Sequence, residues 1–173
     1  MTDAYTTADR IDGLDERSLV LALQEVIEEL AAEAPPEALP MDRDEARALL
    51  TALLESGGYG STELPQLDES GEYAASRRVL AELAEDPATR AAAEPVLAEP
   101  PVDTRLGAEI AVTSLVTVAG VVAWLQTKVD VRIKRKEGKT EFEFRVVKEP
   151  ASAGLLKDLA AAVLRLWSGP PQQ

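Results

Sequence analysis

The sequence contains no cysteine and no histidine. The absence of cysteine excludes disulfide bonds and thiol chemistry, and it is compatible with a cytoplasmic protein. The absence of histidine removes the commonest general base of nucleophilic catalysis and the commonest nitrogen ligand of zinc. No Ser-x-x-Lys pattern offers an alternative nucleophile and base. We therefore expect a protein that is not an enzyme and that holds no cofactor or metal.

Lysine is missing from residues 1–105, where 24 acidic residues and 8 arginines leave a net charge of −16. Every lysine lies between positions 128 and 157. Residues 128–148 carry 8 basic and 4 acidic side chains, a net charge of +4 in a chain of net charge −13. Charge asymmetry of this kind is typical of a partner-binding surface, although two segments of different origin would also produce it.

The rest of the chain is organised around residues 129–147, where apolar and polar side chains alternate. This period of two is typical of strands with one buried face. Between the two alternating runs lies Glu137-Gly138, and glycine supplies the positive φ that a two-residue hairpin turn requires. The pattern predicts a β-hairpin whose apolar face consists of Val129, Val131, Ile133, Phe142, Phe144 and Val146.

The turn also predicts the register of the hairpin. Folding about it places Lys136 opposite Lys139, and it places three opposite-charge pairs on the polar face: Lys134 with Glu141, Arg132 with Glu143, and Asp130 with Arg145. A slip by one residue would turn every apolar side chain to the wrong face. Because a two-stranded ribbon is not stable alone, we expect the helices on either side of it to cover the apolar face with a core that includes Trp124, Leu159 and Trp167.

The predicted fold is α+β and mostly α, with an N-terminal helical region followed by a helix–hairpin–helix unit. We expect an acidic helical domain over residues 1–93, a proline-rich linker over 94–105, the helix–hairpin–helix domain over 106–167 and a disordered tail over 168–173. Residues 1–14 are interpreted as a frayed end. Helices are expected from Asp15 or Ser18 to Ala32, from Asp42 to Glu55, over about 70–84, and from Asp86-Pro87, which resembles an N-cap and first helical position.

Residues 110–127 contain no charged side chain, and two interpretations stay open for them. A helix that is apolar on all sides is typical of a protein core, and this is the structure we favour. The run also reaches the length threshold of a membrane span, with Trp124 and Lys128 near one end as interfacial anchors. No basic and apolar signal-peptide run follows Met1, so secretion is not expected.

Basic side chains cluster on the hairpin. The polar face and tip predict a partner-binding surface made of Arg132, Lys134, Lys136, Lys139 and Arg145. A basic β-ribbon could lie on nucleic acid, but acidic neighbours neutralise part of this charge and no aromatic side chain lies on that face to stack on bases. A protein partner is therefore the favoured expectation.

Two other local patterns have simpler explanations than a ligand site. Residues 57–62 are rich in glycine, but they follow a helix and lack the lysine of a phosphate-binding loop, so we expect a helix terminator and a flexible loop. Asp42, Asp44 and Glu45 could hold Mg²⁺ through their carboxylates, but adjacent acids at a helix start are usually caps.

The C-terminal run resembles a known family. A hydrophobic helix ending in Trp124-Leu125 enters a Val-x-Val-x-Ile strand from Val129 to Ile133, and Gly138-Lys139 leads into a second alternating strand and a terminal helix. This arrangement is similar to the small effector-associated constant component domains of actinobacterial conflict systems. The resemblance covers about residues 106–167. It implies a non-catalytic unit that couples a variable effector to a sensor or protease partner, and it supplies no catalytic residues.

The sequence thus predicts a cytoplasmic, non-catalytic adaptor that binds another protein. Unpaired hairpin edges also predict a homodimer in which two hairpins form a four-stranded sheet. The alternatives are a membrane-anchored accessory protein that uses residues 110–127 and a nucleic-acid-binding β-ribbon.

Overall fold

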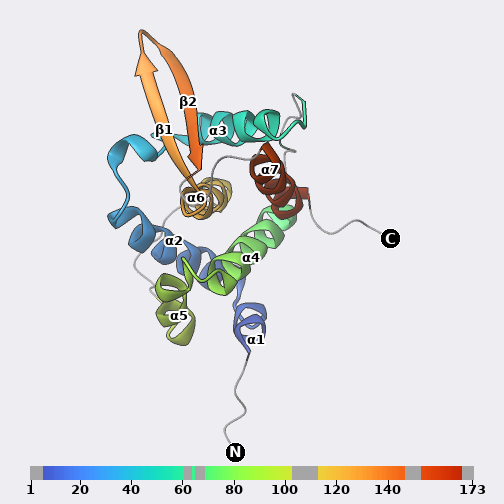
Figure 1. Cartoon of the computed structure of the whole chain (residues 1–173). Helices are drawn as coiled ribbons and strands as arrows, with labels where there is room; N and C mark the ends of the chain where they lie inside the picture. Colours follow the sequence, from blue (N-terminus) through green and yellow to red (C-terminus); the bar gives the residue numbers. More distant parts are fainter. Residues whose placement is uncertain (1–5, 61–63, 65–68, 103–112, 147–152, 169–173) are drawn as a thin grey trace, which may run out of the picture. The chain divides into compact units, whose positions relative to one another are not determined.

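A computed structural model describes residues 6–60, 64, 69–102, 113–146 and 153–168. The described chain is mostly helical and contains a two-stranded antiparallel hairpin (Figure 1), so the predicted α+β class is confirmed. The expected disordered tail lies outside the described residues except for Ser168, which is the last residue of a helix.

The chain forms two compact units that interleave along the sequence. Unit 1 contains the described residues of Met1–Ala32 and Leu67–Gly120, and unit 2 contains those of Glu33–Gln66 and Val121–Gln173. The expected division into consecutive domains at residues 93 and 105 therefore differs from the observed one. The reason is that the described residues of the range 33–66, which we assigned to an N-terminal helical domain, belong to the same compact unit as the hairpin.

Unit 1 is helical. It consists of α1 (Thr7–Asp12), α2 (Glu16–Ala32), α4 (Glu69–Glu85), α5 (Arg90–Ala98) and the first half of α6 (Thr113–Gln126). The Asp15 carboxylate accepts a hydrogen bond from the Ser18 amide at 2.7 Å, which satisfies a free donor at the start of α2 as predicted. The fully buried apolar side chains of this unit include Leu19, Leu23, Val79, Leu80 and Leu83.

The expectation of a frayed N-terminus is wrong for residues 6–12. Thr6 and Asp9 form a reciprocal capping box at the start of α1, in which each side chain accepts a hydrogen bond from the other residue's amide. Ile11 is buried, and the Arg77 guanidinium donates to the Ile11 carbonyl at 2.7 Å. The capping box and the buried side chain of Ile11 stabilise this helix. A six-residue segment can have both features without the long hydrophobic stripe by which helices are predicted from sequence.

The start of α5 also differs from the prediction. The helix begins at Arg90 with Thr89 as N-cap, because the Asp86 carboxylate accepts from the Ala88 amide and closes a turn there instead. The helix continues to Ala98 through Pro95, so residues 94–98 of the predicted linker are helical. Ala93, Val96 and Leu97 are buried, and this apolar face explains why the segment packs as a helix.

Unit 2 contains η1 (Pro36–Ala38), α3 (Arg43–Ser56), the last part of α6, β1 (Val129–Lys136), β2 (Lys139–Val146) and α7 (Ala153–Ser168). The Asp42 carboxylate caps α3 by accepting from the Glu45 amide at 2.8 Å, as predicted. The helix ends at Ser56-Gly57, also as predicted, and packs against α7. Trp124, Leu159 and Trp167 are buried in this unit.

The hairpin has the predicted register at every pair, from Val129 opposite Val146 to Lys136 opposite Lys139. Glu137 and Gly138 both have positive φ, 48° and 76°, as the two central residues of a type I′ turn require. The backbone elements that approach the strands most extensively are η1 beside β1 and α3 beside β2. Part of the cover that we expected from the flanking helices therefore comes from residues 36–56.

Candidate protein-interaction surface

The apolar face of the hairpin is covered on one strand and partly open on the other. On β1, Val129, Val131 and Ile133 are buried. On β2, Phe142 and Phe144, which point to the same face, are only half-buried. These are the only two phenylalanines of the chain, and each offers more apolar area than a valine. The side chain of Val146 is not described. The prediction that all these residues form the core is thus confirmed for β1 and only partly for the phenylalanines.

The outer edge of β2 pairs with no strand in the described part of the chain. The residues that flank a two-residue hairpin turn form a hydrogen-bonded pair, and such pairs then alternate along the ladder. With Lys136 and Lys139 as the closing pair, the odd-numbered residues of β2 bond to β1. The main-chain groups of Thr140, Phe142 and Phe144 consequently point to the outer edge.

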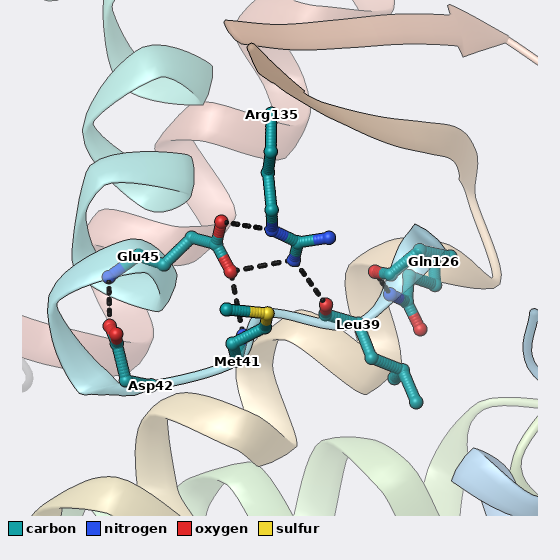
Figure 2. Close-up of polar contacts among 7 residues, drawn as sticks. Leu39, Met41, Asp42, Glu45, Gln126 and Arg135 are labelled. Atoms are coloured by element: carbon teal, nitrogen blue, oxygen red, sulfur yellow. Dashed lines mark hydrogen bonds and ion pairs between the residues drawn. The ribbon is translucent and has the colours of Figure 1, made fainter. Parts of the chain in front are cut away.

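One arginine joins the hairpin to α3 (Figure 2). The guanidinium of Arg135 binds the Glu45 carboxylate with both arms of its fork, at 2.8 Å from Nε to Oε1 and 2.7 Å from the terminal nitrogen to Oε2. The same terminal nitrogen donates to the Leu39 carbonyl at 3.0 Å. The Glu45 side chain is 10% exposed and that of Arg135 is 31% exposed. A bidentate pair fixes orientation as well as distance, so this contact holds the hairpin tip at a defined place beside α3.

Further hydrogen bonds hold the segment that links η1 to α3. Glu45 accepts from the Met41 amide at 2.6 Å in addition to its bonds with Arg135. The Gln126 amide nitrogen donates to the Ala38 carbonyl. Figure 2 shows these groups converging from α3, α6 and β1 on residues 38–42. Residues 38–42 are therefore anchored at both ends, and they form a fixed wall beside the hairpin.

A groove of about 450 Å³ lies between the start of α3 and the tip half of the hairpin. Its apolar lining comes from Met41, Ala48 and Phe142, and Met41 is 74% exposed. Its polar lining includes Asp44 on α3 and Lys139 on β2. The groove is continuous with the half-open apolar face through Phe142, so both features belong to one surface. We call the outer edge of β2, Phe142, Phe144 and this groove the β2 surface.

The predicted binding residues Arg132, Lys134, Lys136, Lys139 and Arg145 are all exposed and share the other face of the hairpin, which we call the charged face. Its ion pairs differ from the predicted directly opposite ones. Nζ of Lys134 lies 2.9 Å from Oε2 of Glu143, which is diagonally across the hairpin. Nε of Arg132 lies 3.7 Å from Oδ2 of Asp130, which is on the same strand. The hydrogen bond from Lys134 lowers the pKa of Glu143 below its usual value. Acidic side chains therefore compensate part of the positive charge.

Our prediction omitted Arg135 from the site. Its position in the alternation places it on the apolar face with Val131 and Ile133, and a charged residue at such a position needs a partner from another element. The period of two could have identified this requirement. It could not have identified Glu45, which lies 90 residues earlier in the chain.

Two of the three acids at the start of α3 have structural partners. Asp42 caps the helix and Glu45 binds Arg135, and the described residues contain no cluster of acids that could hold a metal ion. Gly58 and Gly60 have positive φ after the end of α3, and residues 61–63 lie outside the described part. Within the described chain, no helix has both the length and the apolar character needed to cross a membrane.

The Arg135–Glu45 pair predicts a specific acid sensitivity. The hydrogen bond from Arg135 lowers the pKa of Glu45 in the folded protein, so the pair contributes its full stability above the unfolded-state pKa of a glutamate. That contribution is lost as the pH falls through the lower, folded-state pKa. We expect Glu45→Gln to lower the urea midpoint of unit 2 at neutral pH and to reduce the further loss between about pH 5 and pH 3.

Arg135→Met serves as the matched variant because it removes the other half of the same pair. Both single variants and the double variant should show the same reduced acid sensitivity, measured by tryptophan fluorescence, since Trp124 and Trp167 lie in unit 2. If the urea midpoint of Glu45→Gln fell as much as that of the wild type between about pH 5 and pH 3, the Arg135–Glu45 pair would not be the source of the acid sensitivity.

No protein-family model matches this chain, and searches of the curated proteins and of the solved structures found no match either. The resemblance of residues 106–167 to effector-associated constant component domains therefore stays a prediction.

Proposed function

We propose that this protein is a non-catalytic adaptor that docks another polypeptide on its β2 surface. The observation that supports this most strongly is the unequal cover of the apolar face, which buries Val129, Val131 and Ile133 of β1 and leaves Phe142 and Phe144 of β2 partly exposed. Partly exposed aromatic side chains next to a strand edge that pairs with no other strand among the described residues are a combination that stable monomers usually avoid.

The edge determines how the partner binds. Main-chain groups of Thr140, Phe142 and Phe144 point outward, so an extended segment can add to β2 as a further strand. Its hydrogen bonds would supply affinity with little dependence on sequence. Alternate side chains of that strand would lie over Phe142 and Phe144, and burial of this apolar area would provide the main gain in free energy.

The groove adds selectivity at the tip end of β2. An apolar side chain of the partner would enter between Met41, Ala48 and Phe142, where the lining is apolar. Asp44 of α3 and Lys139 of β2 both line the groove, so a partner segment that brings a cation towards Asp44 and an anion towards Lys139 would be favoured over one with the reverse arrangement. The Arg135–Glu45 pair keeps the groove formed before the partner arrives, which lowers the ordering cost of binding.

The cellular role follows from the same proposal. A small module that binds another polypeptide at a strand edge fits an accessory component that connects two proteins in a bacterial conflict or signalling system. The proposal places it in the cytoplasm, in agreement with the lack of cysteine. Nucleic acid is the less favoured ligand, because Glu143 and Asp130 compensate Lys134 and Arg132 on the charged face.

Site-specific photo-crosslinking in the host cell tests the proposal. A photoreactive phenylalanine analogue replaces Phe142 or Phe144, and the matched control carries it in place of Glu29, which is exposed on α2. We expect an adduct of discrete mass from both hairpin positions and none from position 29. Thr140→Pro should reduce the adduct, because it removes an outward donor without touching the ladder to β1. Absence of adducts at 142 and 144, or the same adducts at 29, would overturn the proposal.

A further inference from the structure

We propose that the polypeptide that occupies the β2 surface is a second copy of this chain, paired antiparallel through β2 about a two-fold axis at Phe144. This inference rests on the proposed function, because it identifies the partner of the same surface. The resulting four-stranded sheet would have both apolar faces on one side and would leave no β2 edge unpaired.

The charges of β2 are complementary to those of a second β2 in this arrangement. With Phe144 on the axis, Glu143 of each copy lies opposite Arg145 of the other. The row across the four strands then runs Arg132, Glu143, Arg145 and Asp130, since the register within each hairpin places Arg132 beside Glu143 and Asp130 beside Arg145. Opposite charges thus alternate across the sheet, and the two-fold axis repeats the row.

The apolar face is complementary in the same register. Phe144 meets its own counterpart, and Phe142 lies opposite Val146 of the second copy. Phe144 therefore gains an aromatic neighbour on the open side of its strand, while β1 lies on the other side. Aromatic cross-strand pairs are among the most favourable in antiparallel sheets. The main-chain groups of Phe142, Phe144 and Val146 are outward, as the new ladder requires.

Neighbouring registers are less favourable. An axis at Phe142 would place Glu141 opposite Glu143 and Lys139 opposite Arg145, so every charged pair would be repulsive. An axis at Glu143 would place that residue opposite itself, although it would pair Glu141 with Arg145. A shift of the axis by half a residue is excluded, because it would bring apolar side chains of one copy opposite charged side chains of the other.

This self-complementarity is what favours a second copy over an unrelated segment. An extended peptide of unrelated sequence would need a cation opposite Glu143, an anion opposite Arg145 and apolar side chains at alternate positions. The β2 strand itself has these residues in this order. The interface would add to the hairpin a strand that already has the correct conformation, so association has a low ordering cost.

A charge-exchange mixture tests the pairing. Arg145→Glu and Glu143→Arg each create two like-charge contacts in a homodimer, and we expect each variant to dimerise at least about tenfold more weakly than the wild type. When the two variants are mixed in equal amounts, both cross-strand contacts of the heterodimer again join a carboxylate to a guanidinium. A heterodimer of near wild-type affinity should therefore form. Sedimentation velocity with one variant labelled measures this directly.

A single cysteine reports the register, since the natural chain has none. Cα atoms of a hydrogen-bonded antiparallel pair lie about 5.5 Å apart, within the range that a disulfide spans. Phe144→Cys should therefore cross-link to itself on mild oxidation. Lys136→Cys is the control, because the two hairpin tips would lie at opposite ends of the antiparallel pair. Glu143→Cys tests the competing register, because this variant would cross-link to itself most readily if the two-fold axis lay at Glu143 instead of Phe144.

The outcomes separate this inference from the proposed function. A wild-type chain that is monomeric at several hundred micromolar overturns the second-copy proposal, and so does a charge-exchange mixture that stays monomeric. Stronger cross-linking of Glu143→Cys than of Phe144→Cys overturns the proposed axis. Photo-adducts of position 144 with a different protein would in any of these cases keep the adaptor function. An adduct with the mass of two chains, together with heterodimer formation, would support the second copy as the occupant of the β2 surface.

Discussion

Replacing Gly57 by alanine should destabilise unit 2 by about 2 kcal/mol, which is typical when atoms are forced into a packed contact. A Cβ atom at this position would lie 2.5 Å from the Cβ of Ala160, 3.0 Å from the Leu156 carbonyl oxygen and 3.2 Å from the Lys157 Cα. Two of these atoms belong to the backbone of α7, so no side-chain rotation relieves the contact. The end of α3 would have to move away from α7.

The backbone conformation cannot explain such a loss. Gly57 has φ −79° and ψ 0°, which alanine adopts without strain. At such positions the change to alanine normally stabilises a protein, because it restricts the unfolded chain. Gly13 is the matched control: it ends α1 with nearly the same φ and ψ, and its added Cβ would meet nothing closer than 3.4 Å. Gly13→Ala should be neutral or slightly stabilising.

Urea unfolding followed by tryptophan fluorescence measures the effect on unit 2, which contains both tryptophans. Equal midpoints for wild type and Gly57→Ala would mean that α3 and α7 do not approach as closely as described.

Replacing Gly120 by alanine should destabilise unit 1 by about 1–2 kcal/mol for a related reason. The added Cβ on α6 would lie 2.7 Å from Cγ1 of Val79 on α4 and 3.3 Å from Cδ1 of Leu23 on α2. These atoms are side-chain ends, which can shift, so the loss should be smaller than at Gly57. The glycine thus allows α6 to pack closely against α4 and α2.

A second substitution should relieve the strain. Val79→Ala alone removes buried methyl groups and should cost about 1–2 kcal/mol. Combined with Gly120→Ala, it provides the space that the new Cβ needs, so the double variant should be more stable than the sum of the two single effects predicts. Thermal unfolding followed by circular dichroism gives the three values. Strict additivity would show that Val79 does not limit the approach of α6.

The hairpin was predictable because its information is local. Alternation, one glycine at a turn and matched charges determine the register within about twenty residues, and a slip would reverse every side chain. The difference between the strands was not predictable. Val131 and Phe144 lie opposite each other in the same pattern, and the contribution of residues 36–56 to the cover, with η1 beside β1 and α3 beside β2, follows only from the fold.

Arg135 illustrates the same limit for the candidate site. Its place on the apolar face follows from the sequence, but its partner Glu45 follows only from the fold. We expected one acidic domain over residues 1–93, whereas the described residues of the range 33–66 belong to the same compact unit as the basic hairpin. Glu45 of the acidic segment and Arg135 of the basic segment therefore form an ion pair in the fold, because a two-stranded ribbon needs cover and the nearby segments alone do not supply all of it.

The most direct test of the β2 surface is residue-resolved amide hydrogen exchange of β2. In the paired form, the outward amides of Phe142 and Phe144 should exchange as slowly as the amides of Glu141 and Glu143, which bond to β1. Dilution, or the Arg145→Glu substitution, should accelerate exchange at Phe142 and Phe144 while leaving Glu141 and Glu143 protected. Fast exchange at Phe142 and Phe144 at every concentration, beside protected Glu141 and Glu143, would contradict the claim that a second chain occupies this edge.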